Sequence, residues 1–221
     1  MNNTYLSVII PAYNEEKTVF RVLNSVQKAF QNTEHEIIVV DDCSTDTTGL
    51  ICEFYPNIKY VRLDKNRGKG YAMREGIKYA KGAFVAIQDA DLEYNPEKLY
   101  ELFLQIKDGT AIYGKRDRKQ GYFLYKMGNA FLSWTCNFLY RSNLFDIYTC
   151  YKIIPTALVK SLNLKSDGFE IEAEITAKLL RAEIPIIEIP IPYTSRTFNE
   201  GKKIRGKDAV VGIWTLIKNR F

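Results

Sequence analysis

The sequence is poor in the residues that build zinc sites and disulfide frameworks. It contains one histidine, His35, and four cysteines, none of which belongs to a C-x-x-C pair. Zinc sites and small disulfide-stapled scaffolds need clusters of these residues, so neither kind of protein is expected. Unpaired cysteines at irregular spacing are typical of a reducing compartment, which predicts a cytoplasmic location.

Long hydrophobic runs are also missing. No apolar run approaches the roughly 18 to 20 residues that a membrane-spanning helix needs, and the first residues lack the pattern of a secretion signal. We therefore expect a protein that is not integral to a membrane by its own sequence. The formal net charge of +5 is modest, and no nucleic-acid reader motif occurs, so nucleic acid is not an expected partner.

The first part of the chain alternates strand and helix patterns. Apolar, β-branched runs predict strands, and each is followed by a segment with helical periodicity. This alternation predicts an α/β fold, with an open, mostly parallel sheet and helices on both faces. The expected strands are residues 5–11, 36–42, 58–63, 82–91 and 110–116.

The second part of the sequence, from about residue 121, has a different pattern of residues. The aromatic segment 121–140 predicts one or two amphipathic helices, residues 170–182 a further helix, and the proline-containing run 184–193 an edge strand. The tail from Arg196 is basic and turn-like, and residues 208–221 are expected to form a helix. We predict a catalytic domain over 1–195, with the 121–145 helices on its acceptor and membrane side. Residues 196–221 would then supply a basic loop and an interfacial helix.

Two aspartates end the expected fourth strand. Asp89 and Asp91 would point to the same face of that strand, while Ala90 points to the other, because side chains alternate. Two carboxylates held together repel each other unless a cation lies between them, and Mg²⁺ or Mn²⁺ suits such oxygen ligands. A solvated turn after the strand is the alternative interpretation of this isolated D-x-D pattern.

Other polar residues follow the neighbouring strands, where α/β sheets bind ligands. Tyr13 offers a flat surface for a nucleobase and Glu15 an acceptor, although acidic residues also favour a helix N-terminus. Asp42 could accept hydrogen bonds from a base or ribose, or cap a turn. In NRGKG (66–70), Lys69 and backbone N–H groups at a helix start could meet an anion, but this motif alone is weak.

Jointly, these motifs carry a resemblance. SVIIPAYNEE, EIIVVDDCSTDTTG, NRGKGYAMREGI, AIQDADLEYNP, GFEIEAEI and EIPIPYTSRTFNEGKKI occur in this order. They resemble family 2 glycosyltransferases of the GT-A (Rossmann-like) fold, in the dolichol- or polyprenyl-phosphate mannosyltransferase branch. The resemblance covers nearly the whole chain.

The resemblance implies roles for particular residues. The nucleotide pocket would be lined by Pro11, Ala12, Tyr13, Glu15, Asp42, Lys69, Asp89 and Ala90. The metal would be held by Asp89, Asp91 and Glu93. The acceptor phosphate would be addressed by Arg116, Lys126, Arg196 and Lys202. The residues expected to carry catalysis are Asp91, Arg116, Arg196 and Lys202.

The implied reaction is metal-dependent, inverting transfer of a hexose to a dolichyl or polyprenyl phosphate. GDP-mannose is the first choice of donor, and UDP-sugars are the alternative. No residue stands out as a general base, and an acceptor phosphate is already anionic near neutral pH, so it needs none. A soluble hydroxyl acceptor would need one, and Glu170, Glu172 and Glu174 keep that alternative open. A non-catalytic nucleotide-binding module is less expected, because Asp89, Asp91 and Arg196 are intact.

Aromatic and basic residues in the second part suggest contact with a membrane surface. The aromatic residues are Phe123, Tyr125, Phe131, Trp134, Phe138 and Trp214. Such interleaving resembles interfacial helices, although these side chains could instead pack on the sheet. We expect a peripheral protein on the cytoplasmic face of a membrane, bound directly or through a membrane partner subunit.

Overall fold

A seven-stranded sheet forms the centre of the computed structural model, which describes residues 5–117, 123–194, 196 and 206–221. The strand order is β3-β2-β1-β4-β6-β5-β7, and β6 alone runs antiparallel to its neighbours. The strands are β1 (Leu6–Ala12), β2 (His35–Asp41), β3 (Lys59–Arg62), β4 (Phe84–Ile87), β5 (Ala111–Arg116), β6 (Lys152–Pro155) and β7 (Ile186–Ile191).

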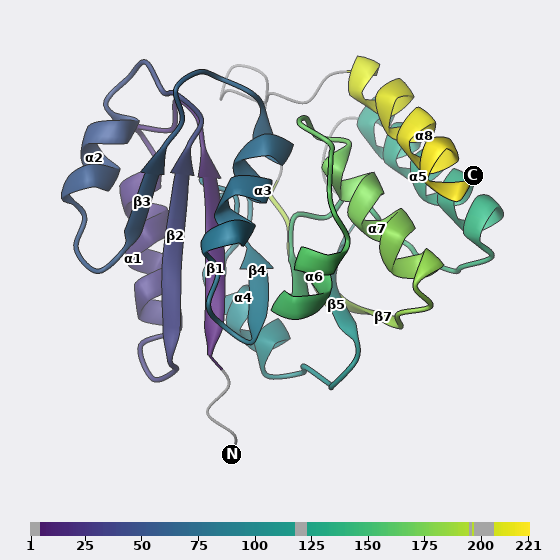
Figure 1. Ribbon diagram of the computed structural model, residues 1–221, viewed down its shortest axis with the longest axis horizontal. Coiled ribbons are helices and arrows are strands. Elements are labelled where there is room, and N and C mark those ends of the chain that lie inside the picture. The colour runs from purple at the N-terminus through teal and green to yellow at the C-terminus, as the bar shows by residue number, and fades with distance from the viewer. Residues whose placement is uncertain (1–4, 118–122, 195, 197–205) are drawn as a thin grey trace.

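Helices cover both faces of this sheet. In Figure 1, α3, α6 and α7 lie in front of the strands and α1 and α4 behind them, while α5 and α8 lie side by side beyond β7. The helices are α1 (Val19–Ala29), α2 (Thr48–Phe54), α3 (Lys69–Tyr79), α4 (Pro96–Phe103), α5 (Phe123–Tyr140), α6 (Thr156–Ser161), α7 (Ile171–Arg181) and α8 (Gly206–Arg220). The predicted α/β architecture is confirmed.

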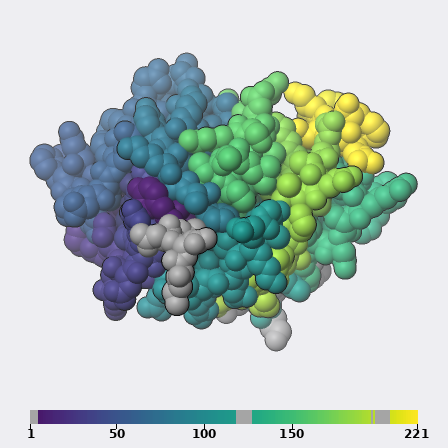
Figure 2. All heavy atoms as spheres, turned by 60° about the horizontal axis from the view of Figure 1, so that its bottom comes forward, coloured from purple at the N-terminus to yellow at the C-terminus, as the bar shows by residue number. Residues whose placement is uncertain are grey.

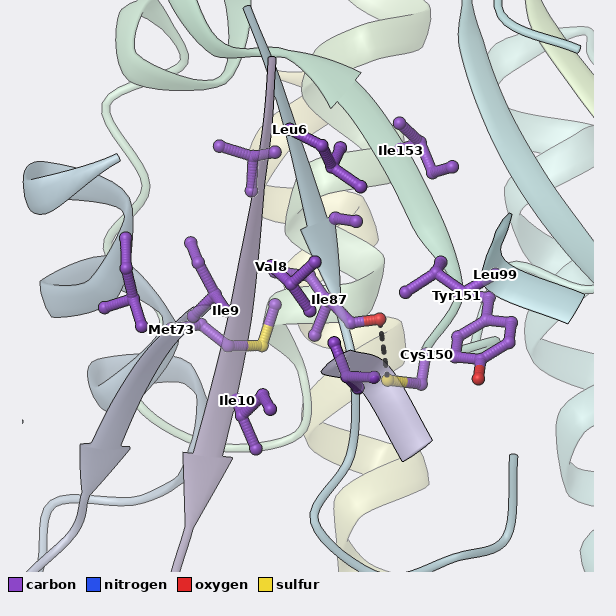
Figure 3. Packing of buried hydrophobic residues seen from close by; sticks show 14 of the residues in the cluster. Leu6, Val8, Ile9, Ile10, Met73, Ile87, Leu99, Cys150, Tyr151 and Ile153 are labelled. Carbon is purple, nitrogen blue, oxygen red and sulfur yellow. Dashed lines mark hydrogen bonds between the residues drawn. The ribbon is translucent and has the colours of Figure 1, made fainter. Parts of the chain in front are cut away.

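The central strands are apolar because both of their faces are covered. Ile9 and Ile38 are neighbours in the parallel register of β1 and β2, and neither is exposed to solvent. Side chains from α3 and α4, such as Met73 and Leu99, pack against the strands from opposite sides (Figure 3). Strands buried on both faces are expected to be continuous apolar runs, which explains why the sequence pattern predicted them.

Two elements were not predicted from the sequence. The segment after residue 145 supplies β6 and the short helix α6. β6 joins the two halves of the sheet by pairing with β4 on one side and β5 on the other. Its strand conformation depends on these long-range pairings, which a local sequence pattern does not show. The predicted edge strand at 184–193 is confirmed as β7, and the aromatic segment forms a single helix, α5.

The helices α5, α7 and α8 share a smaller core. Leu132, Cys136, Ala177 and Leu216 are buried where these helices meet. In the space-filling view, the N-terminal half and the C-terminal helix α8 occupy opposite ends of the molecule (Figure 2). Within the described part of the chain, each helix is too short or too polar to span a bilayer.

Candidate active site

Asp89 and Asp91 lie in a turn beyond the strand, which corrects the prediction that they belong to it. Pairing of β4 with β1 ends at Ile87, and Leu92 takes a left-handed backbone conformation with φ of 62°. The chain therefore turns before side-chain alternation could place the two carboxylates on one face of a strand. They still lie at the carboxyl edge of the sheet, where the sequence placed them.

The two carboxylates differ in their partners. Asp89 lies 2.8 Å from the Lys69 ammonium, which holds the pKa of Asp89 below its ordinary value against the opposing effect of burial. Asp91 accepts a hydrogen bond from the Glu93 backbone N–H at 3.0 Å. Burial, with the negative charges of Asp89 and Glu93, raises the pKa of Asp91 to about 7. Asp91 is thus the carboxylate with most to gain from a cation.

Arg196 connects two segments that are far apart in the sequence, one containing Glu15 and the other containing Asp91 and Glu93. Its side chain donates to the carbonyl of Asp91 at 2.8 Å and to the carboxylate of Glu15 at 2.9 Å. Its backbone N–H donates to Glu93, which also accepts from the Tyr193 hydroxyl. The structure therefore brings Glu15, Asp91, Glu93 and Arg196 into one cluster, as expected for residues of a common site.

Asp42 binds the start of α3. Its two carboxylate oxygens accept from the backbone N–H groups of Arg67 and Gly68, each at 2.7 Å. Burial raises the pKa of Asp42, although these two donors oppose the shift. Two of the backbone N–H groups in the 66–70 motif are thus occupied by Asp42 in this structure.

The remaining predicted nucleotide residues lie beside this cluster. Pro11 and Ala12 end β1, and Tyr13 follows them with a partly exposed ring. Ala90 is buried between the two aspartates. Two predicted residues are not placed by the structure, because Lys202 lies outside the described residues and the side chain of Lys126 is not described.

The glycines of NRGKG serve a packing role. A Cβ atom on Gly70 would lie 2.6 Å from the Ser166 carbonyl oxygen and 2.7 Å from that of Gly168. Gly68 has φ of +100°, and a Cβ atom there would lie 2.5 Å from the Asp167 carbonyl oxygen. These positions therefore fit the start of α3 against the 166–168 loop.

Replacing Gly70 should cost stability. We expect Gly70→Ala to lower the free energy of unfolding by about 1 to 3 kcal/mol, since the backbone oxygens cannot yield. Gly128 in α5 is the matched control, because a Cβ there meets nothing within 4 Å, and alanine should stabilise a helix interior by up to about 1 kcal/mol. Urea denaturation of both variants checks this, and equal midpoints would contradict it.

Arg116 is held by a partner that the sequence did not reveal. Its guanidinium makes a two-pronged ion pair with Asp146, with N–O distances of 2.6 and 2.8 Å. Asn129 donates to the same carboxylate at 3.0 Å, and the Tyr193 ring lies 5.0 Å from the guanidinium. Arg116 also lines an open hollow of about 700 Å³ at the carboxyl ends of β5 and β7.

The three glutamates considered as general bases are all engaged. Glu170 accepts from the backbone N–H of Gly168 at 3.1 Å, and Glu174 accepts from backbone groups of the 165–166 loop. Glu172 is buried and forms an ion pair with Lys152, whose side chain is completely buried. Glu172 and Glu174 are thus buried and paired with Lys152 and Lys178, whereas Glu170 is half-buried and accepts a single hydrogen bond.

The predicted metal ligands are not gathered into a three-carboxylate site. Over the described ranges, no three histidine, cysteine or acidic side chains are arranged to hold a metal ion. Lys69 pairs with Asp89, and Tyr193 and Arg196 occupy Glu93. The donor chemistry still fits a hard cation, because Mg²⁺ commonly uses one or two carboxylates together with substrate phosphates.

Comparison with solved structures agrees with the fold described above. The described fold matches glucosyl-3-phosphoglycerate synthase from Mycobacterium tuberculosis, crystallised with Mn²⁺, UDP and phosphoglyceric acid, with a TM-score of 0.78 and 19% identity over 98% of this chain and 78% of that one. The chain therefore has the GT-A fold that the sequence predicted.

The family follows from the sequence comparison. The model of glycosyl transferase family 2 matches residues 7–161, more than half of the chain, so this protein belongs to that family.

Two curated relatives are longer than this chain. Dolichol-phosphate mannosyltransferase from Pyrococcus furiosus is 28% identical, with 91% of this chain aligned to 60% of the relative. Dodecaprenyl-phosphate galacturonate synthase from Rhizobium johnstonii is 30% identical, with 73% of this chain aligned to 51% of that protein. The predicted family is thus confirmed.

Proposed function

We propose that the protein transfers a hexose, with inversion, from a nucleotide sugar to a dolichyl or polyprenyl phosphate. The observation that carries this proposal is the burial of Glu172 and Glu174, whose carboxylates are paired with Lys152 and Lys178. A hydroxyl acceptor needs a general base, whereas a phosphate monoester is already anionic near neutral pH. The names of the two curated relatives, which refer to dolichol phosphate and dodecaprenyl phosphate, support the same acceptor class.

In this proposal the nucleotide of the donor binds between the ends of β1 and β4. Pro11, Ala12 and Tyr13 form one wall of the site, and Asp42 and Lys69 lie at the start of α3. Arg116 and Arg196 then face the acceptor phosphate, together with Lys126 and Lys202. Both arginines are prearranged by carboxylates, so binding an anion there requires little reorganisation.

Asp91 and Asp89 are the residues proposed to hold the divalent cation, with Glu93 beside them. The raised pKa of Asp91 supports this, since a cation would relieve the repulsion among the three carboxylates. When bound, Mg²⁺ or Mn²⁺ neutralises charge on the departing nucleoside diphosphate. The chain itself supplies the ligands and keeps Arg196 next to them.

Donor, acceptor and metal can be tested together. We expect one member of a panel of GDP- and UDP-sugars, led by GDP-mannose, to label polyprenyl phosphate in the organic phase, and EDTA to abolish the labelling. Added Mn²⁺ or Mg²⁺ should restore it. If a nucleotide sugar binds but no donor labels the lipid, the phosphate acceptor is wrong and a glycan hydroxyl becomes the acceptor to test. If no nucleotide sugar binds, the proposed enzyme activity itself is refuted.

The exposed aromatic stripe on α5 is the proposed contact with the membrane. Phe131, Trp134 and Phe138 follow one another along the helix, with ring centroids 5.7 and 5.9 Å apart. Trp134 and Phe138 are 60% and 74% exposed, and Trp214 is exposed on the adjacent α8. Aromatic rings on a helix near basic residues suit the interface of an anionic leaflet. We propose that the protein is peripheral, on the cytoplasmic face, bound directly or through a membrane partner subunit.

Removing this stripe should weaken membrane binding. We expect Trp134→Ser with Phe138→Ser to lower the partition onto vesicles of phosphatidylcholine and phosphatidylglycerol by at least about 10-fold, since each ring contributes more than 1 kcal/mol when buried. The matched control is Leu50→Ser with Phe54→Ser, two equally exposed apolar side chains on α2. Co-sedimentation measures both variants, and equal losses would argue against a specific membrane face.

A further inference from the structure

A chain of alternating charges runs from the core to the candidate site. Lys152 on β6 forms an ion pair with Glu172 on α7. The other carboxylate oxygen of Glu172 lies 3.1 Å from the Lys69 ammonium. Lys69 in turn lies 2.8 Å from Asp89. Positive and negative groups thus alternate over four side chains, three of which come from elements that are far apart in sequence.

The inner end of this chain is fixed. The Lys152 ammonium donates to the backbone carbonyls of Ile147 and Thr149 as well as to Glu172, and it lies 4.8 Å from the centre of the Tyr113 ring. Its side chain is 0% exposed. Buried ion pairs often add little net stability, because both charges lose their hydration. This pair therefore calls for a role other than holding the core together.

The outer end of this chain of charges, Lys69 and Asp89, lies at the carboxyl ends of the strands. Lys69 is the first residue of α3, and its side chain is 15% exposed. Glu172 contacts the Lys69 ammonium as an ion pair, but among the described residues that oxygen lacks a partner with hydrogen-bond geometry. Glu172 therefore acts on Lys69 through charge. The carboxylates of Asp89 and Glu172 thus both contact the Lys69 ammonium beside the proposed donor site.

We propose that Glu172 and Lys152 are positioning residues for Lys69. Lys152 fixes Glu172, and Glu172 holds the Lys69 ammonium beside Asp89, where it meets the diphosphate of a bound nucleotide. The inference rests on the proposed function, because it assumes that this site binds a nucleoside diphosphate. In this role Glu172 does not accept a proton from the acceptor. Its carboxylate lies between the Lys152 and Lys69 ammonium groups and orients the Lys69 ammonium.

The test separates orientation from packing. Lys152→Met combined with Glu172→Gln removes one positive and one negative charge, so the core stays electrically balanced. We expect this double variant to recover most of the melting temperature that Glu172→Gln alone loses. Its affinity for UDP or GDP with Mn²⁺, measured by calorimetry, should nevertheless stay about 10- to 100-fold below that of the unaltered protein, as when a supporting partner of a ligand is lost.

A coupled variant makes the readout specific. Lys69→Met should cause a similar loss of nucleotide affinity, and adding it to the double variant should cause little further loss, because the residues act through one group. The positioning role is overturned if the stable double variant binds nucleotide normally. It is also overturned if the affinity loss of the triple variant equals the product of the losses in Lys69→Met and in the double variant. If the double variant does not fold, Glu172→Gln measured below its own melting temperature gives the same comparison with Lys69→Met.

Failure of the proposed function would look different. In that case the unaltered protein would bind neither UDP nor GDP in the presence of Mn²⁺, and the inference would fall with it. If the unaltered protein binds nucleotide and only the variants behave otherwise than expected, the positioning role alone fails. The binding assay needs no lipid acceptor, so an error about the acceptor leaves this test intact.

Discussion

The Asp91→Ala variant is expected to lose sugar transfer by at least about 100-fold while keeping its fold. Asp91 is half-buried, and desolvation together with the negative charges of Asp89 and Glu93 raises its pKa to about 7. Its removal takes away a proposed metal ligand but also relieves repulsion between like charges. The loss should therefore appear in turnover and in the response to Mn²⁺, whereas the melting temperature should change little.

Transfer of label to the organic phase, measured with increasing Mn²⁺, is the readout for this variant. Asp108→Ala serves as the control, since Asp108 is an exposed aspartate in a turn away from the cluster. Normal turnover in Asp91→Ala would refute the metal assignment. An unfolded Asp91→Ala protein would also contradict the expectation, because it would make the carboxylate a structural group.

The Asp146→Ala variant is expected to lose about 3 to 5 kcal/mol of unfolding free energy. Asp146 is 1% exposed and is the carboxylate that pairs with the Arg116 guanidinium. Without it, a largely buried positive charge is left uncompensated, and the Asn129 side chain loses its acceptor. Because Arg116 is also a proposed acceptor residue, its displacement should impair the use of polyprenyl phosphate in any variant that still folds.

An exposed pair of the same kind provides the comparison. Asp64 lies 3.6 Å from Arg67 with its side chain 74% exposed, and such surface pairs contribute between about 0.2 and 1 kcal/mol. Denaturant unfolding of Asp64→Ala and Asp146→Ala measures the difference directly. Equal losses would mean that the Arg116 pair is not the stabilising contact that its burial indicates.

The sequence predicted the parts of the fold that local patterns determine. Continuous apolar runs identified β1 and β2, and helical periodicity identified α1 and α3, because each pattern follows from which side chains are buried. β6 escaped prediction, since its strand character comes from lying between β4 and β5. The end of β4 at Ile87 was placed too late, because the sequence does not show where pairing with β1 stops.

The sequence predicted where the candidate site lies, but not which side chains pair with one another in it. Strand ends located Glu15, Asp89 and Asp91 at one edge of the sheet. Spacing could not reveal that Lys152 reaches Glu172 or that Asp146 meets Arg116, since these pairs join residues 20 and 30 positions apart. A lysine in an otherwise apolar strand, KIIP, was the available signal, because a buried lysine needs a carboxylate partner.

The antiparallel strand between β4 and β5 also constrains how the chain can reach its native state. β4 and β5 do not pair with each other, because β6 (residues 152–155) lies between them and pairs with both. During synthesis, the first four strands can pair while β4 still presents an unpaired edge, and such edges promote association between chains. Closure of the sheet must await a segment made after the whole of α5. Folding should therefore proceed in two stages, with an early, aggregation-prone half-sheet whose lifetime depends on the arrival of β6.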